Sequence, residues 1–335
     1  MATYYVDTAV GNNGNAGTSE GAGNAWATIQ YANDNISNGD QVYIKASGDY
    51  TEGVTLTAGT VAAWRTFTGY TSTPGDGGKA TIDASGQTNG MNCPGFASSY
   101  IRFENIIVEN ATGDGFEASA TSYVAFINCE ANSNGGVGFG GGPANAVYAH
   151  CAADGNTGDG FIIDVVAAAV FCSSTNNGGD GFVGNSNGGS FAYCISSSNV
   201  NDGFSNRSLI AVHCTIDGDG KDTDSGIITG GKGSAIVNNI IYDCTTGITG
   251  TAGYGGDVIL SNLLYSNTAN YSNVVNEQDN ETGKAPGFTD EAGGDYTLAK
   301  GSDARNAGAD VSGASSPGVD IGAHQSADAA VIITG

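Results

Sequence analysis

The sequence predicts an all-β chain folded as a right-handed parallel β-helix, a solenoid of stacked coils of about 21–23 residues each. Three observations carry this prediction. Glycine supplies 55 of the 335 residues, so the chain turns often. Short stretches that alternate apolar and polar residues recur along the chain, as strands with one buried face do. Glycine followed by phenylalanine returns with spacings of 23, 22, 21 and 22, at Phe116, Phe139, Phe161, Phe182 and Phe204.

The fixed period indicates stacking, because a unit of about 22 residues cannot bury an apolar face alone. Stacked copies place parallel strands ~4.8 Å apart around a continuous interior of like side chains. A leucine-rich repeat has a similar period, but it needs several leucines per repeat. The Gly-Asp-Gly-Phe units contain none. The sequence therefore favours the β-helix, with Ile227, Ile248 and Tyr271 continuing the phenylalanine column.

Residues 99–275 are predicted to form the regular coils, and further columns follow the period. Alternating pairs such as Ile101/Phe103, Ala235/Val237 and Val258/Leu260 should point inward. An inward column of cysteines stands ten residues before the phenylalanines and continues through Cys214 to Ile240 and Leu263. Its members are expected to be buried free thiols, because paired CxxC metal motifs are absent: Cys129, Cys151, Cys172, Cys194 and Cys214.

A column of asparagines marks one corner of each coil. A left-handed backbone suits asparagine, and its amide can bond to the copies above and below. Both properties are predicted for the residues five positions before each phenylalanine: Asn134, Asn156, Asn177 and Asn199.

The two ends depart from the period and are predicted to cap a single structural domain. Residues 1–98 should form an N-terminal cap and irregular first coils. Trp26, Ile29 and Ile36 lie on one face of a predicted capping helix. Strands are expected at 3–6, 41–45, 66–70 and 79–83. Residues 276–335 are predicted to form a C-terminal cap and tail.

The charge balance restricts the partners. Ten Lys and Arg face 34 Asp and Glu, a net charge of −24, so nucleic acid and anionic membrane surfaces should be repelled. A polyanionic polysaccharide would be repelled as well unless cations intervene. No run of 18 apolar residues exists, so membrane insertion is not expected. The first residues lack the pattern of a secretory signal. An extracellular or virion-associated location is expected, as for a mature chain or a virion protein released by lysis.

The first candidate site is a column of aspartates, of which Asp180 and Asp202 lie on successive coils. Carboxylates about 5–10 Å apart suit the acid and base of a glycosidase. The alternative is that Asp beside Gly is a turn residue repeated along the stack. The whole column consists of Asp114, Asp159, Asp180, Asp202 and Asp224.

The second candidate is an acidic insertion at 217–224, which carries four carboxylates and has Asp202 one coil below. Ca²⁺ takes six to eight oxygen ligands, and flexible acidic loops supply them. The alternative is a solvated acidic loop. The predicted calcium ligands are Asp202, Asp217, Asp219, Asp222 and Asp224.

The third candidate is the column that precedes the cysteines. Aromatic rings with flanking polar groups can stack on sugar rings, and the alternative is a stack that only shelters a corner. The column reads Asn128, His150, Phe171, Tyr193, His213 and Asn239, and its four ring-bearing members are the predicted substrate-binding residues.

The chain resembles the right-handed β-helix proteins of the pectin-lyase-like superfamily. The resemblance rests on Trp-Ala-Thr-Ile-Gln at 26–30, Gly-Asp-Gln-Val-Tyr-Ile-Lys-Ala at 39–46, the repeats, and the closing Asp-Ile-Gly-Ala at 320–323. Members often continue that ending with an aromatic and an acidic residue, where this chain has His324 and Gln325. The resemblance spans nearly the whole chain and implies the fold. The superfamily includes polysaccharide lyases, glycoside hydrolases, epimerases, viral tail spikes and adhesins, so it does not imply one activity.

The sequence also departs from the enzymes of that superfamily. The Asn-Thr-Asp, paired Asp-Asp, Gly-His-Gly and Arg-Ile-Lys segments of polygalacturonase-like members are absent. Pectate-lyase-like members use Ca²⁺ with Arg and Lys on a groove, and here Arg207 is the candidate for such a base.

The resulting hypothesis is a polysaccharide lyase or glycoside hydrolase, with Asp180, Asp202 and Arg207 as catalytic candidates and Ca²⁺ as a cofactor. The alternative is a non-catalytic glycan-binding or structural module of a virion or cell surface, which as a viral appendage could be a homotrimer.

Overall fold

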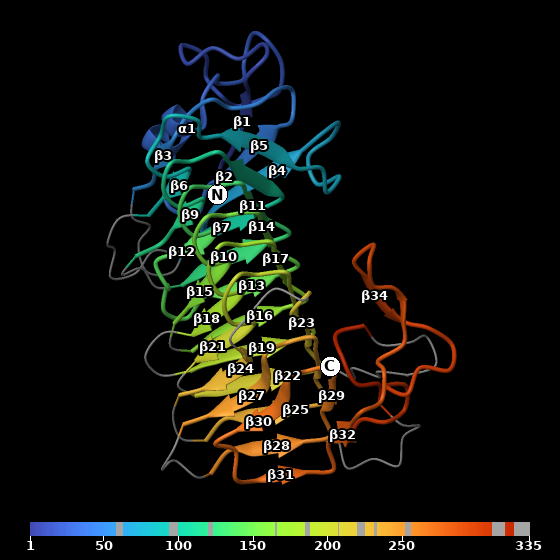
Figure 1. Cartoon of the computed structure of the whole chain (residues 1–335). Coiled ribbons are helices and arrows are strands. Elements are labelled where there is room, and N and C mark those ends of the chain that lie inside the picture. Colours follow the sequence, from blue (N-terminus) through green and yellow to red (C-terminus); the bar gives the residue numbers. More distant parts are fainter. Residues whose placement is uncertain are drawn as a thin grey trace. The chain divides into compact units, whose positions relative to one another are not determined.

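The computed structural model describes residues 1–57, 63–93, 100–119, 123–164, 166–184, 188–206, 208–219, 225–230, 233–251, 256–309 and 319–324. The chain divides into two compact units, Met1–Ala168 and Ala169–Gly335. In each unit short parallel strands stack in three sheets, here called A, B and C (Figure 1). The predicted all-β, right-handed parallel β-helix is confirmed. Within the described ranges, no helix is long and apolar enough to cross a membrane.

In the first unit the strands of successive coils lie side by side in these sheets, and the first coils do not supply a strand to every sheet. Sheet A contains β1 (Thr3–Asp7), β2 (Gln41–Lys45), β4 (Arg65–Tyr70), β7 (Ile101–Glu104), β10 (Val124–Ile127) and β13 (Val147–Ala149). Sheet B contains β5 (Ala80–Asp83), β8 (Ile106–Glu109), β11 (Glu130–Asn132) and β14 (Ala152–Asp154). Sheet C contains β3 (Val54–Thr55), β6 (Met91–Asn92), β9 (Phe116–Glu117), β12 (Phe139–Gly140) and β15 (Phe161–Ile163).

The four strands predicted before residue 84 are β1, β2, β4 and β5, so the first coils are confirmed. The predicted helix is α1 (Ile29–Asn35). Thr28 is its N-cap residue, because the Thr28 Oγ1 accepts a hydrogen bond from the Tyr31 N–H at 3.2 Å. Trp26 and Ile29 are buried beside it.

The second unit repeats the plan. Sheet A contains β19 (Gly189–Ala192), β22 (Leu209–Val212), β25 (Ala235–Val237), β28 (Val258–Leu260) and β31 (Glu277–Gln278), and β16 (Ala167–Val170) spans the boundary between the units. Sheet B contains β17 (Ser173–Thr175), β20 (Ile195–Ser197), β23 (Thr215–Asp217), β26 (Ile240–Tyr242), β29 (Leu263–Tyr265) and β32 (Glu281–Thr282). Sheet C contains β18 (Phe182–Gly184), β21 (Phe204–Asn206), β24 (Ser225–Thr229), β27 (Thr246–Gly250) and β30 (Ala269–Ser272). Two antiparallel strands follow, β33 (Phe288–Asp290) and β34 (Asp295–Leu298).

The phenylalanine column is a buried ladder of stacked rings in each unit. The ring centroids of Phe139 and Phe161 lie 4.6 Å apart with the planes 3° from parallel. Those of Phe182 and Phe204 lie 4.8 Å apart. The preceding glycine is required because a Cβ on Gly181 would lie 2.7 Å from the carbonyl oxygen of Gly203 in the next coil. The Gly-Phe repeat therefore marks the place where successive coils approach most closely.

All seven cysteines are buried as free thiols. Burial raises the pKa of the Cys129 and Cys194 thiols well above the ordinary value. The column thus acts as a set of small apolar side chains that fill the corner between sheets A and B.

The asparagine column is confirmed as a ladder, but the predicted left-handed backbone is wrong for it. The side-chain amide of Asn177 donates to Oδ1 of Asn199 at 2.9 Å, and Asn134 donates likewise to Asn156. The positive φ falls one residue earlier, on Ser133, Asn176 and Ser198. The preceding residue turns the chain, so the asparagine side chain can point inward and bond to the next coil.

After residue 230 the residues that point inward lie one position away from the predicted ones. Ala211 pairs with Ile236 and Ile236 pairs with Ile259, so these two isoleucines continue the inward column of Ala211. Val237 is buried as well, on the opposite face of β25. The predicted inward pairs Ala235/Val237 and Val258/Leu260 are therefore wrong. The cysteine column likewise continues through Asn239, because Ile240 pairs with Thr215. Strand side chains alternate faces, so one residue of slip moves every prediction to the opposite face.

Candidate functional site

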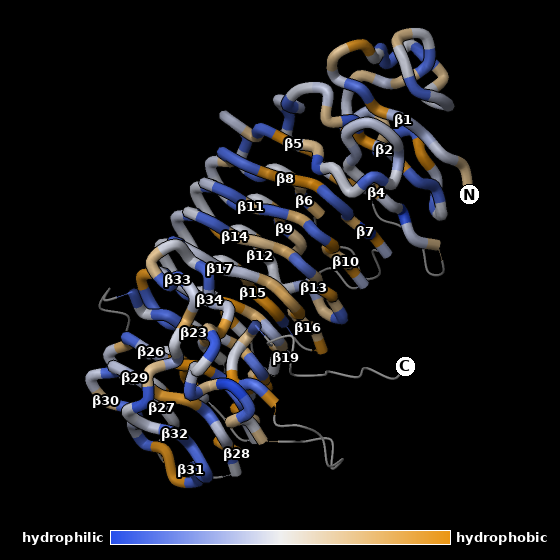
Figure 2. The backbone as a smooth tube through the Cα atoms, turned by 90° about the vertical axis from the view of Figure 1, so that its right-hand side faces the viewer, coloured by the Kyte–Doolittle hydropathy of each residue, from blue (hydrophilic) through white to orange (hydrophobic). Residues whose placement is uncertain are grey.

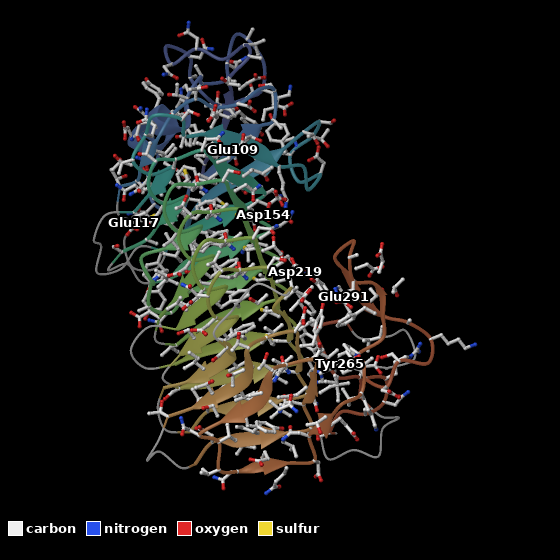
Figure 3. The ribbon with its side chains drawn as sticks, viewed as in Figure 1. Glu109, Glu117, Asp154, Asp219, Tyr265 and Glu291 are labelled. Carbon is white, nitrogen blue, oxygen red and sulfur yellow. The ribbon has the colours of Figure 1, made fainter. Side chains whose placement is uncertain are left out.

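A cleft of about 840 Å³ lies on the outward face of sheet B in the second unit. Its floor consists of outward side chains of β17, β20 and β23, and its far wall is the turn between β33 and β34. Figure 3 shows Asp219 on the coils and Glu291 on the C-terminal segment, facing each other. The residues that line it are Ser173, Thr175, Asn176, Ile195, Ser197, Ser198, Asp217, Asp219, Glu291, Ala292, Gly294 and Tyr296.

The C-terminal segment forms the wall because sheet B is apolar on both faces in the later coils. Ile240, Tyr242 and Leu263 point outward and are buried against Tyr296 and Leu298. Ile321 and Ala304 belong to the same apolar cluster. In Figure 2 the segment with β33 and β34 lies over the sheet B strands β23 and β26. Where this cover ends, over β17 and β20, the small polar side chains of the floor remain accessible.

Asp217 is the buried carboxylate of the cleft, with 7% of its surface exposed. Its Oδ2 accepts a hydrogen bond from the Tyr296 hydroxyl at 2.8 Å, and its Oδ1 accepts one from the Asp219 N–H at 2.8 Å. Burial raises the pKa of Asp217, and these donors oppose the rise. Asp219 itself adopts a left-handed backbone and accepts a hydrogen bond from the Ser198 hydroxyl at 2.9 Å.

Tyr242 lies beneath the carboxylates with 2% of its surface exposed. Its hydroxyl has no hydrogen-bond partner among the described residues. The hydroxyl is nevertheless close enough to the carboxyl groups of Asp217 and Glu291 to oppose the rise in their pKa values. Burial, and then the contact with the Asp217 carboxylate, raise the pKa of Tyr242. A neutral phenol thus stands below the acidic groups.

Glu291 lies at the rim of the cleft. Partial desolvation raises its pKa, and the nearby Asp217 charge adds to the rise. In the part of the lining that the structure describes, there are three carboxyl groups, those of Asp217, Asp219 and Glu291, and no Lys, Arg or His. The cleft is therefore an acidic site that can hold and transfer a proton.

The predicted aromatic column forms a stack at the corner where sheet B begins. The Phe171 and Tyr193 ring centroids are 5.0 Å apart, and those of Tyr193 and His213 are 5.1 Å apart. Phe171 is 47% exposed, and Ser173 of the cleft follows it by two residues. His150 occupies the same left-handed corner in the first unit. The structure thus brings Phe171, Tyr193 and His213 together next to the cleft.

His213 is covered by the C-terminal segment. Its Nδ1 lies 3.1 Å from the Asp320 carbonyl oxygen, and its Nε2 lies 3.4 Å from the Asn238 amide nitrogen. Gly322 N–H donates to the Asn238 carbonyl, and Ala323 N–H donates to the Thr215 hydroxyl. Burial lowers the pKa of His213. The closing Asp-Ile-Gly-Ala stretch therefore docks on the side of the coils, and His213 is not exposed to a ligand.

The aspartates of the repeat bond to the backbone of the following coil. Oδ1 of Asp180 accepts from the Asp202 N–H at 3.1 Å, and Oδ1 of Asp202 accepts from the Ser225 N–H at 2.8 Å. Asp114 does the same with Val137. Neither Asp180 nor Asp202 lines the cleft. Their catalytic role stays a prediction, and the observed contacts are those of a turn motif.

Three predicted site residues, Arg207, Asp222 and Asp224, lie outside the described residues. In the part of the chain that is described, no group of three or more His, Cys, Asp or Glu could hold a metal ion. The described ligands Asp202, Asp217 and Asp219 do not form a calcium site by themselves, and the metal prediction depends on the segment that follows Asp219.

Sequence reasoning missed Glu291 and Tyr296. They come from the C-terminal segment, and Tyr296 contacts a carboxylate 79 residues earlier in the chain. A signal was present in β26 and β29, where Ile240-Ile241-Tyr242 and Leu263-Leu264-Tyr265 are apolar on both faces. Such strands need a cover on their outer face.

Comparisons with known proteins support the fold. No protein-family model matches the chain, and no curated protein matches it. Among solved structures it is similar to pectate lyase Pel9A, with a TM-score of 0.73 and 18% identity over 96% of both chains. It is also similar to a rhamnogalacturonan lyase, with a TM-score of 0.70 and 16% identity over 86% of this chain and 91% of the other. At these identities the likeness shows the parallel β-helix fold and nothing finer.

Proposed function

We propose that this chain binds a polysaccharide in the sheet B cleft of the second unit and cleaves it, by hydrolysis or by elimination. The observation that carries the proposal is the cleft itself, where hydroxyl and amide side chains and three carboxyl groups occur together, with the exposed Phe171 two residues before Ser173 of the floor. Sugars present hydroxyls and an apolar ring face, which these two kinds of group complement.

The acidic groups supply the chemistry. Bond cleavage in a polysaccharide needs a group that gives a proton to the leaving oxygen and a group that accepts one. Raised pKa values at Asp217 and Glu291 favour the protonated form of a carboxyl group, as a general acid requires. Pectate lyase Pel9A and the rhamnogalacturonan lyase are named for polysaccharide substrates, which agrees with a glycan as ligand.

Calcium binding is a separate proposal that involves Asp217, Asp219 and the acidic residues after them. If the segment binds Ca²⁺, adding a chelator will lower the unfolding temperature of the protein, and adding Ca²⁺ will restore it. An unchanged unfolding temperature would count against the calcium site without affecting the glycan proposal.

The second candidate is a glycan-binding module without catalysis, on a virion or cell surface. The observation that favours it is the engagement of Asp180 and Asp202 in backbone hydrogen bonds. Binding without product, for every glycan that binds, would establish this candidate.

The test is a panel of neutral and acidic polysaccharides, followed by affinity electrophoresis for binding and by reducing-end and ultraviolet assays for products. The variant Ser173→Trp fills the cleft floor at the first residue of β17 and should abolish binding. Ser205→Trp is the matched control, because Ser205 lies on β21 in sheet C, away from the cleft. Absence of binding by the wild type, or equal binding by both variants, would overturn the proposal.

A further inference from the structure

We infer that the cleft accepts a glycan built of neutral sugars rather than a polyuronate, and that cleavage is therefore hydrolysis. This inference rests on the proposed function and narrows its substrate class. Among the described residues, the lining presents Asp217, Asp219 and Glu291 and no cationic side chain. Each uronate carboxylate placed in the cleft would face like charges within a partly desolvated site, where repulsion is stronger than in water.

The buried phenol of Tyr242 supports the same substrate class. Tyr242 is buried, and its hydroxyl interacts with the carboxyl groups of Asp217 and Glu291 and opposes the rise in their pKa values. Tyr296 donates to Asp217 from the side. These neutral donors stabilise carboxylate charge that belongs to the protein. They leave the floor to Ser173 and Thr175, whose hydroxyls match sugar hydroxyls and offer no charge to pair with a uronate.

The substrate class determines the reaction. Elimination removes the C5 proton of a uronate residue, which is made acidic by the adjacent carboxyl or ester group, and a glycan of neutral sugars has no such group. In hydrolysis the C1–O bond breaks, a carboxylic acid gives its proton to the leaving oxygen, and water gives its oxygen to C1. A second carboxylate takes the proton released from water, so one water is consumed. Glu291 at the rim is the acid in this scheme, and Asp219 on the opposite wall is the carboxylate.

The pKa of Glu291 agrees with that role, since desolvation and then the Asp217 charge raise it. Asp217 is too deeply buried to contact a sugar, at 7% exposure, and acts as a positioning residue through its charge. The floor of the cleft comes from the coils and its far wall from the β33–β34 turn. The site is therefore complete only with this turn packed on the coils.

The first experiment compares polygalacturonate with the same polymer after chemical reduction of its carboxyl groups, beside neutral glucans, galactans, mannans and xylans. Each is tested with chelator and with added Ca²⁺. Binding and new reducing ends with a neutral polymer, and not with polygalacturonate, are expected. Stronger binding to polygalacturonate, or an unsaturated product, would overturn the inference and leave the proposed function standing. Binding to none would overturn both.

The second experiment tests the charges. Removing two carboxylates by Asp219→Asn and Glu291→Gln together should raise affinity for polygalacturonate about tenfold at low ionic strength, and salt should reduce that gain. Turnover of the neutral polymer should fall at least about 100-fold while its binding persists. Glu277→Gln is the control, because Glu277 is an exposed carboxylate of β31 outside the cleft. Equal effects of the control and the double variant would contradict the inference.

Discussion

Single side chains bond one coil to the next in this protein. Asn199 shows how: its Oδ1 accepts from the backbone N–H and the side-chain amide of Asn177, and its own amide donates to the Ser174 carbonyl and the Ser196 hydroxyl. A buried asparagine is therefore a connector with all of its bonding groups used. The period of the sequence predicts the asparagine ladder. It does not predict that the residue before each asparagine, and not the asparagine itself, has the positive φ.

Asn199→Ala should lower the free energy of unfolding by about 2–3 kcal/mol, because it leaves the Asn177 N–H buried without an acceptor. Urea titration of the purified variant measures this. Asn201→Ala is the control, since Asn201 is exposed and its substitution should change stability by less than about 0.5 kcal/mol. Similar values for the two variants would refute the role given to the ladder.

His213 contributes to the dependence of the unfolding free energy on pH. Burial keeps its folded pKa below the ordinary value of 6.5, so the unfolded chain binds more protons and stability rises with pH. The contribution of neutral His213 is present above pH ~6.5 and is lost as pH falls toward the lowered pKa. His324 acts in the same direction, since burial lowers its pKa too. Glu117, whose pKa burial raises to about 7, acts in the opposite direction.

His213→Gln should therefore flatten the pH dependence of the unfolding free energy between pH 7.5 and 5.5 relative to the wild type. Comparing variants cancels the carboxyl contributions. His150→Gln removes an exposed imidazole and should leave the profile unchanged. A wild-type profile in the His213 variant would show that its burial is not what makes the protein acid-sensitive.

Elements show which parts of the structure were predictable. Strands of the coils follow from local alternation, so β2 has its predicted bounds. Alternation could not predict which residues of β25 and β28 point inward, because consecutive residues of both strands are apolar. The cleft did not follow either. Its far wall is an irregular segment that returns to β23, and only the packing of Tyr296 and Leu298 on sheet B brings it there.

Tyr296→Phe tests that docking. It removes a hydrogen bond from a buried carboxylate, which should cost about 1–3 kcal/mol of stability and raise the pKa of Asp217 further. Tyr265→Phe is the matched control, since Tyr265 packs against the same cluster without a hydrogen bond to Asp217. Chemical denaturation compares the two. Equal stability of the variants would mean that the Tyr296 hydroxyl does not hold the segment on sheet B.

The carboxylates that give the chain its strong net negative charge have different roles in different places. The repeat aspartates serve the backbone of neighbouring coils, and the carboxyls of the cleft are the ones left for chemistry. The acidic cleft of this acidic chain agrees with the glycan of neutral sugars that we propose as its ligand.

A crystal structure with a bound oligosaccharide, taken from whichever polymer the protein binds, tests the central claim most directly. The account predicts sugar density between Asp219 and Glu291, extending toward the exposed edge of Phe171. Density on sheet A, on sheet C or in the first unit, with the sheet B cleft containing solvent alone, would contradict it.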